Sequence, residues 1–168
     1  MTPLQEMVLM DELVWQAKIA QRAAKRLQTA NDQFDHIEIW SSIQLILIAA
    51  GNVSKILWPA RKKYQSRGEK LRERLKVEED NLLSDRKFRN YFEHYDERID
   101  DWFENQSSAV YTDLAMNPSM SGFGQMSTNR GYNSIDNTLV FRGEVLDLNA
   151  VLNAVEEIRR NCGDYGLK

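Results

Sequence analysis

One short segment of the 168-residue chain combines side chains that are suited to phosphodiester chemistry: Arg89 and Asn90, with His94 four residues after the asparagine. An imidazole titrates near neutral pH and can move a proton in either direction. A guanidinium stays charged and can hold a phosphate with two donors, while an amide can orient either partner. Such a group could take the proton of a ribose 2′-hydroxyl and assist the leaving 5′-oxygen. None of these roles requires a metal.

The segment lies in a predicted helix over residues 81–104. Five apolar residues repeat along it at intervals of four and three, as on a helix face that meets the core: Phe88, Phe92, Tyr95, Ile99 and Trp102. At about 100° per residue, Arg89 falls about 100° from this stripe, Asn90 about 200° and His94 about 240°. We therefore expect Asn90 and His94 to be neighbours on the face opposite the core.

A histidine on that face would be either a solvated surface residue or a functional one. One helix supplies only one histidine, and Arg89 lies well round the helix from it. A second copy across a twofold axis would bring two Arg-Asn-His sets to one cleft and would cover the exposed face. The pattern therefore predicts a homodimer.

The segment resembles the RxxxxH motif of the HEPN superfamily (higher eukaryotes and prokaryotes nucleotide-binding domain). The context is similar too, with a long first helix, an apolar second helix that ends at Trp58-Pro59, a basic connector and the motif on a late helix. The resemblance implies a helical bundle, a homodimer and a metal-independent ribonuclease of a toxin, antiphage or RNA-processing system. It implies a phosphate-binding role for Arg89, a polar supporting role for Asn90 and a catalytic role for His94, with RNA as substrate and an antitoxin or regulatory protein as a possible partner.

Other residues favour a non-catalytic role. Glu93 stands four residues after Arg89 and could hold it in an ion pair. The residues after the motif are acidic and would repel RNA: Asp96, Glu97, Asp100, Asp101 and Glu104. The alternative is therefore a HEPN dimerisation module that binds a nucleotide or a protein. A third hypothesis, an accessory protein that binds ATP-like ligands on the basic connector, has no Gly-rich phosphate loop behind it.

The connector between residues 59 and 80 is basic. Eight lysines and arginines lie between Arg61 and Lys76, against only Glu69 and Glu73. Gly68 is predicted to divide this stretch into a loop and a short helix. The stretch is either a solvated linker or a patch that attracts phosphates, and within it Arg61, Lys62 and Lys63 are the candidate RNA-binding residues.

The rest of the chain predicts one mainly α domain over residues 1–168. We expect a helical hairpin over 3–58, whose second helix is capped by Asn31 or Asp32, and a loop and β-hairpin over 105–148. In that hairpin, residues 132–133 and 138–141 flank a turn, and residues 144–148 could continue as a strand. A last helix over 149–162 would be capped by Asn149 and ended by Gly163. The fold class is therefore an up-and-down helical bundle of HEPN type with a small β-hairpin before the last helix.

Composition predicts a globular protein in the cytoplasm. The hydrophobic share is 42% and the net charge is −3, so no global attraction to nucleic acid is expected. The N-terminus has no basic leader, and the apolar run over 43–50 is too short to span a bilayer. The single cysteine, Cys162, is interpreted as a structural thiol, and His36 as a surface residue or a partner in a local ion pair. No metal or cofactor is expected.

Overall fold

The computed structural model describes residues 1–105, 111–120 and 128–163, and for Phe88 and Arg89 it describes the backbone alone. The chain divides into two compact units. The first comprises residues 1–86 and 150–168, and the second comprises residues 87–149. Within the described residues there are six α-helices and one four-stranded sheet. The prediction of a mainly α protein with a small β element before the last helix is confirmed at that level.

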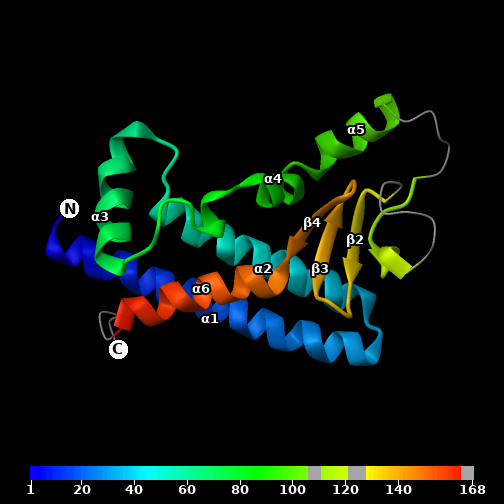
Figure 1. Cartoon of the computed structure of the whole chain (residues 1–168), viewed down its shortest axis with the longest axis horizontal. Coiled ribbons are helices and arrows are strands. Elements are labelled where there is room, and N and C mark those ends of the chain that lie inside the picture. The colour runs from blue at the N-terminus through cyan, green and yellow to red at the C-terminus, as the bar shows by residue number, and fades with distance from the viewer. Residues whose placement is uncertain (106–110, 121–127, 164–168) are drawn as a thin grey trace. The chain divides into compact units, whose positions relative to one another are not determined.

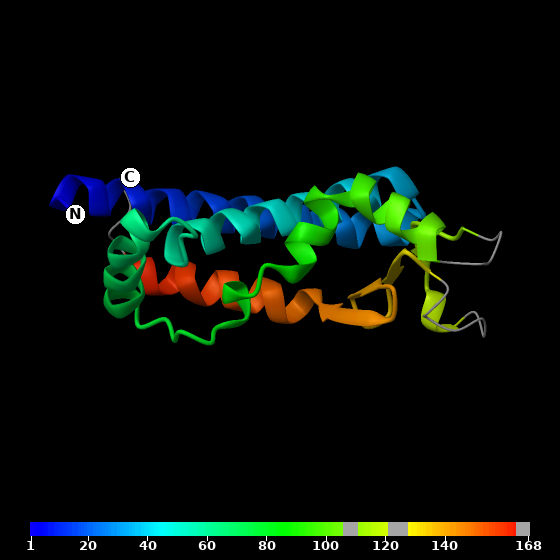
Figure 2. The same ribbon diagram turned by 90° about the horizontal axis from the view of Figure 1, so that it is seen from above.

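The first unit is built on three long helices: α1 (Pro3–Gln33), α2 (His36–Leu57) and α6 (Leu148–Cys162). They run side by side in Figures 1 and 2. The predicted apolar stripe of α2 is confirmed, because all six of its members are buried: Ile39, Ile43, Ile46, Ala50, Val53 and Leu57. Apolar burial on this scale is the main favourable term of folding. Ile48, at 53% exposed, lies outside the core.

The turn between α1 and α2 differs from the prediction. Asn31 and Asp32 lie inside α1, and the N-cap of α2 is Asp35, whose carboxylate accepts from the backbone N–H of Glu38 at 3.1 Å. The first helix ends only at Phe34, which adopts a left-handed conformation with φ of 56°. Three candidates for a cap, Asn31, Asp32 and Asp35, lie within five residues, and the end of α1 decides which one is used.

The connector folds into a 3-10 turn, η1 (Lys62–Tyr64), and α3 (Gln65–Leu75). Gly68 does not break this helix, contrary to the prediction, but lies buried inside it. Arg67 approaches the carbonyl oxygens of Lys55 and Ile56 at 3.4 and 3.2 Å, and Arg72 donates to that of Leu57. These two arginines therefore satisfy the last carbonyls of α2, which a helix leaves without partners of its own.

The second unit contains the sheet, in the strand order β1-β2-β3-β4. Its strands are β1 (Ala115–Met116), β2 (Arg130–Asn133), β3 (Thr138–Phe141) and β4 (Glu144–Asp147). Asn133 pairs with Thr138 across the antiparallel β2–β3 hairpin, so its turn is the predicted one. Strand β4 extends the hairpin, while β1 joins β2 in parallel and was not predicted.

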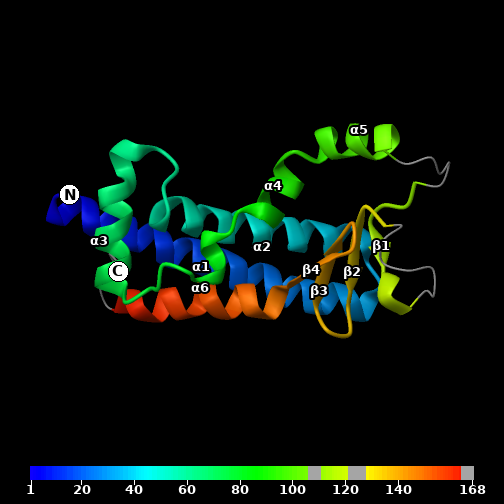
Figure 3. The same cartoon turned by 45° about the horizontal axis from the view of Figure 1, so that its top comes forward.

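The motif segment also lies in the second unit, but not on one continuous helix. Residues 82–84 form the 3-10 turn η2 of the first unit, in which the Asn81 side chain accepts from the backbone N–H of Leu83, and Asp85 is extended. The helices that follow, α4 (Lys87–Glu93) and α5 (Tyr95–Asn105), are labelled in Figure 3. His94 is the residue between them. The helix predicted over 81–104 is therefore wrong in its first turns and is interrupted at the histidine.

The last helix begins one residue before the predicted start and ends at the predicted residue, Cys162. Helix α6 begins at Leu148, and the carboxylate of Asp147 accepts from the backbone N–H of Asn149 at 2.7 Å, in the role predicted for Asn149. Gly163 follows the helix with φ of 53°, as expected of a C-terminal glycine.

Helix α2 is long and apolar enough to cross a membrane by length and composition, but 61% of its most apolar window is buried inside the structure, as in the core helix of a soluble protein.

Candidate nucleic-acid site

The motif residues occupy α4 and the junction that follows it. Arg89 and Asn90 belong to α4, and Asn90 is partly buried. The side chain of Arg89 lies outside what the structure describes, so its predicted ion pair with Glu93 stays a prediction. The backbone N–H of His94 donates to the carbonyl of Asn90 at 3.0 Å, and that of Arg98 donates to the carbonyl of His94 at 3.2 Å. His94, at the junction of α4 and α5, therefore makes a helical backbone hydrogen bond to each of the two helices. Asn90 and His94 lie one turn apart.

The His94 side chain is 54% exposed. Its Nδ1 atom lies 3.5 Å from the Oε1 atom of Glu97, one turn along α5. The other ring nitrogen, Nε2, is at the opposite edge of the imidazole. A carboxylate on the Nδ1 side of the ring leaves Nε2 as the nitrogen that could exchange a proton with a substrate.

The apolar stripe predicted for the motif helix is only partly formed. The ring of Tyr91 stacks on that of Phe141 in β3, with centroids 4.6 Å apart, and Phe92 meets the same ring edge-on at 5.7 Å. Trp102 is 2% exposed, but Tyr95 is 51% exposed. The change of helix at His94 explains the difference, because the spacing of four and three places residues on one face only in an unbroken helix.

An exposed polar cluster adjoins the motif and was not predicted. The carboxylate of Glu144 in β4 forms an ion pair with Lys87 and accepts from the Tyr91 hydroxyl at 3.2 Å. The hydrogen bond from Lys87 lowers the pKa of Glu144, and the same bond raises the pKa of Lys87. Burial, followed by the charge of Glu144, raises the pKa of the Tyr91 phenol. These contacts fasten the first turn of α4 to the edge of the sheet.

A second unpredicted group lies deeper in the unit. Arg130 in β2 binds Asp113 through two bonds, Nε to Oδ1 at 2.9 Å and Nη2 to Oδ2 at 2.5 Å. The hydroxyl of Tyr111 also donates to Asp113, at 3.1 Å. Burial alone would raise the pKa of Asp113, but the hydrogen bonds and charge of Arg130 outweigh it and lower that pKa. The side chains of Asp113 and Arg130 are 14% and 11% exposed, so this is a nearly buried bidentate pair.

Helix α5 carries an excess of acidic side chains next to His94. Asp96, Glu97, Asp100 and Glu104 are exposed. Arg98 is bonded to Asp101 through Nη1 at 3.1 Å. The carboxylates are exposed, and the repulsion of nucleic-acid phosphates that the sequence predicted stays a prediction.

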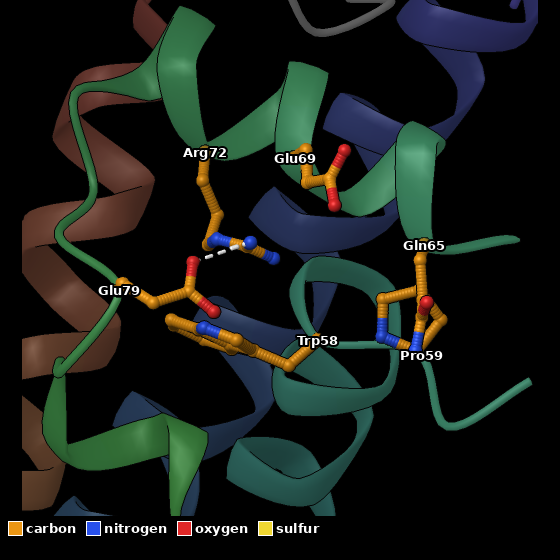
Figure 4. A pocket seen from close by; sticks show the side chains of 6 residues that line it. All are labelled: Trp58, Pro59, Gln65, Glu69, Arg72 and Glu79. Atoms are coloured by element: carbon orange, nitrogen blue, oxygen red, sulfur yellow. Dashed lines mark ion pairs between the residues drawn. The ribbon is translucent and has the colours of Figure 1, made fainter. Parts of the chain in front are cut away.

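The basic connector belongs to the first unit. Arg61, Lys62 and Lys63 are exposed there, as a phosphate-binding role would require. Arg72 is different: it is 9% exposed, pairs with Glu79 at 2.5 Å and lies over the ring of Trp58 (Figure 4). It lines a polar cavity of about 330 Å³, together with Trp58, Pro59, Gln65, Glu69 and Glu79. The eight positive charges of the connector are therefore not one patch, because some of them serve the fold.

The remaining candidate residues have structural positions. His36 is exposed as the first residue of α2, which agrees with the surface position predicted for it. Cys162 is fully buried, and its burial raises the pKa of the thiol to about 11. Within the described part of the chain, no three His, Cys, Asp or Glu side chains are grouped so that they could hold a metal ion.

Comparison with known proteins gave no match: neither a family model nor a curated protein nor a solved structure matches the chain.

Proposed function

We propose that this protein is a metal-independent endoribonuclease of the HEPN type, which acts as a homodimer through Arg89, Asn90 and His94. The observation that carries the proposal is the exposed His94 imidazole one helical turn after Asn90, with Nδ1 turned toward Glu97. The Arg-Asn spacing and the resemblance to the HEPN motif support it further. The roles in toxin or antiphage systems and the antitoxin partner stay predictions from that resemblance.

In this mechanism one imidazole takes the proton from the ribose 2′-hydroxyl through Nε2. The 2′-oxygen then forms a bond to phosphorus while the bond from phosphorus to the 5′-oxygen breaks. Arg89 stabilises the charge on the phosphate oxygens, and Asn90 orients the phosphate. In the homodimer, His94 of the second protomer gives a proton to the leaving 5′-oxygen. The products are a 2′,3′-cyclic phosphate and a 5′-hydroxyl.

The experiment uses the purified full chain, labelled single-stranded RNA and excess EDTA. We expect cleavage that leaves 2′,3′-cyclic phosphate ends, and we expect His94→Ala to abolish it while the oligomeric state is unchanged. His36→Ala is the matched control, since the chain has only these two histidines. Specific activity should also fall on dilution below the dimer dissociation constant. Cleavage that persists in His94→Ala would reject the proposal.

The acidic surface of α5 favours a second candidate, a non-catalytic dimerisation or binding module. Carboxylates disfavour RNA but suit a protein partner that carries positive charge. This candidate predicts that wild-type protein and His94→Ala are equally inert toward every RNA tested, and that a specific protein or nucleotide ligand is retained. The same cleavage assay separates the two candidates.

A further inference from the structure

We propose that Arg130 in β2 is a positioning residue for His94, which it holds through the aromatic side chains on either side of that histidine. The inference rests on the proposed function for the importance of His94. Beyond that function, it identifies the residue of the sheet that keeps the His94 imidazole in place.

The contacts of the Arg130 guanidinium span the α4–α5 junction. Its Cζ atom lies 5.9 Å from the ring centroid of Phe92 and 5.7 Å from that of Tyr95. Phe92 is in the last turn of α4, and Tyr95 is the first residue of α5. A guanidinium at this distance from an aromatic ring is attracted to it, and more strongly where water is excluded. One side chain of the sheet therefore fixes the segments before and after His94.

Arg130 is itself held firmly enough to serve as an anchor. The two bonds to Asp113 fix the plane of the guanidinium, and Asp113 in turn accepts from Tyr111. Both members of the ion pair are nearly buried. Departure of either one would leave an uncompensated charge inside the unit, so the pair has one strongly favoured arrangement.

A second arginine, in the turn between β3 and β4, contacts the next turn of α5. Arg142, just after β3, donates to the carbonyl of Arg98, and its Cζ lies 5.7 Å from the ring centroid of Trp102. Its Nε donates to Asn129 at 3.0 Å. These contacts lie beyond His94 on one side only. Arg98 in α5 also reaches the ring of Tyr91 in α4, with its Cζ 5.2 Å from the centroid. Of Arg130 and Arg142, Arg130 is the one with ring contacts on both sides of His94.

The histidine depends on this anchor because its own side chain is more than half exposed. Little packing of its own fixes the imidazole, so its direction follows that of the junction backbone. Reacting groups must be held close to their productive geometry, and a displacement of about 1 Å can cost about a hundredfold in rate. We therefore expect Arg130 to affect the chemical step without contact with RNA.

The test is a spectroscopic measurement that does not depend on activity. Histidine Cε1–Hε1 correlation spectra of the full chain contain two signals, and His94→Ala identifies one of them. Arg130→Met keeps a long unbranched side chain but removes the charge. It should shift or broaden the His94 signal and leave that of His36 unchanged. Arg159→Met is the matched control, since it removes an arginine from the pair with Glu156 in α6 and should move neither signal. An unchanged His94 signal in folded Arg130→Met would overturn the proposal.

A second variant covers the case in which Arg130→Met does not fold. Tyr95→Leu removes a half-exposed ring and keeps the Arg130–Asp113 pair. It should also move the His94 signal. Phe34→Leu, in which an 83% exposed ring at the end of α1 is removed, should not. Equal effects of these two leucine variants would contradict a specific role for the Arg130 contact.

Cleavage assays then distinguish this proposal from the proposed function. In an active enzyme, Arg130→Met should lower kcat about tenfold or more and leave KM within about twofold, because positioning acts on the chemical step. Wild-type protein that cleaves no RNA would reject the proposed function, while the His94 spectra would still decide the positioning role. If cleavage depends on His94 but the His94 signal is the same in wild type and Arg130→Met, only the positioning role is rejected.

Discussion

A Cβ atom added to Gly68 in α3 would stand 2.5 Å from the carbonyl oxygen of Leu57, the last residue of α2. It would also stand 2.5 Å from the Cδ atom of Pro59. The backbone of α3 therefore packs directly on the end of α2. This close approach brings Arg67 and Arg72 within reach of the last α2 carbonyls.

Gly68→Ala is expected to destabilise the protein. Overpacking costs about 1–3 kcal/mol, and the atom in the way is a backbone carbonyl that cannot rotate aside. The gain in helix propensity, about 1 kcal/mol, offsets part of the strain, so the net loss should be up to about 2 kcal/mol. Urea titration measures it, with Lys70→Ala at an exposed site of α3 as the control. Equal stability of the two variants would mean that α3 can move away from α2 without cost.

Gly68 also illustrates which parts of the fold the sequence could predict. Helix α2 was predictable because the burial of its apolar stripe follows from spacing alone. The β2–β3 turn was predictable because polar residues separate two β-prone runs. The role of Gly68 was not, since a glycine reads as a helix breaker unless the neighbouring backbone is known. A missing side chain gives no sequence signal of the contact it permits.

Some residues of the candidate site could likewise be predicted from the sequence, and others could not. His94 was predicted on an exposed face, and it is exposed. Arg130 and Asp113 were missed because they are 17 residues apart in sequence, with no periodicity that links them. The exposure of Tyr95 was missed because the prediction assumed one unbroken helix, whereas α4 ends at Glu93 and α5 begins at Tyr95. The sequence offered one signal for this ion pair: Asp113 and Arg130 carry opposite charges and both precede the predicted hairpin.

The Arg130–Asp113 pair should make stability depend on acid pH. The pKa of Asp113 is lowered in the folded state, since the contacts with Arg130 outweigh the effect of burial. The pair's stabilisation is therefore present above the unfolded pKa, about 3.9, and is lost as the pH falls through the folded value. Below pH 4 the free energy of unfolding should fall more steeply in wild type than in Asp113→Asn. Asp100→Asn, which removes an exposed carboxylate of α5, is the control and should behave like wild type. Parallel pH profiles for wild type and Asp113→Asn would contradict the effect.

Cys162 should be inert to thiol reagents in the folded protein. Its side chain is buried, and burial raises the thiol pKa to about 11, so about one thiol in a thousand would be ionised at pH 8. Reaction with a disulfide reagent should therefore be slow at pH 8 and become fast only in urea, with a midpoint that matches unfolding. Rapid labelling without urea would show that the C-terminal turn of α6 opens locally.

The basic connector should divide into residues that bind RNA and residues that serve the fold. Arg61, Lys62 and Lys63 are exposed, whereas Arg72 is buried against Trp58 and paired with Glu79. If the three exposed cations bind phosphates of single-stranded RNA, their joint replacement by alanine should reduce the slope of log K against log salt by about 2, since each contact contributes about 0.7. Folding stability should remain close to that of wild type.

Arg72→Met supplies the contrast within the same connector. It should cost about 2 kcal/mol of stability, because the bond to Leu57 involves a charged donor. The salt slope should not change, since this charge is already neutralised by Glu79. Fluorescence anisotropy with labelled RNA at several salt concentrations gives the slopes, and urea titration gives the stabilities. A triple variant with the wild-type slope would remove Arg61, Lys62 and Lys63 from any RNA-binding surface and leave the solvated-linker interpretation of the connector.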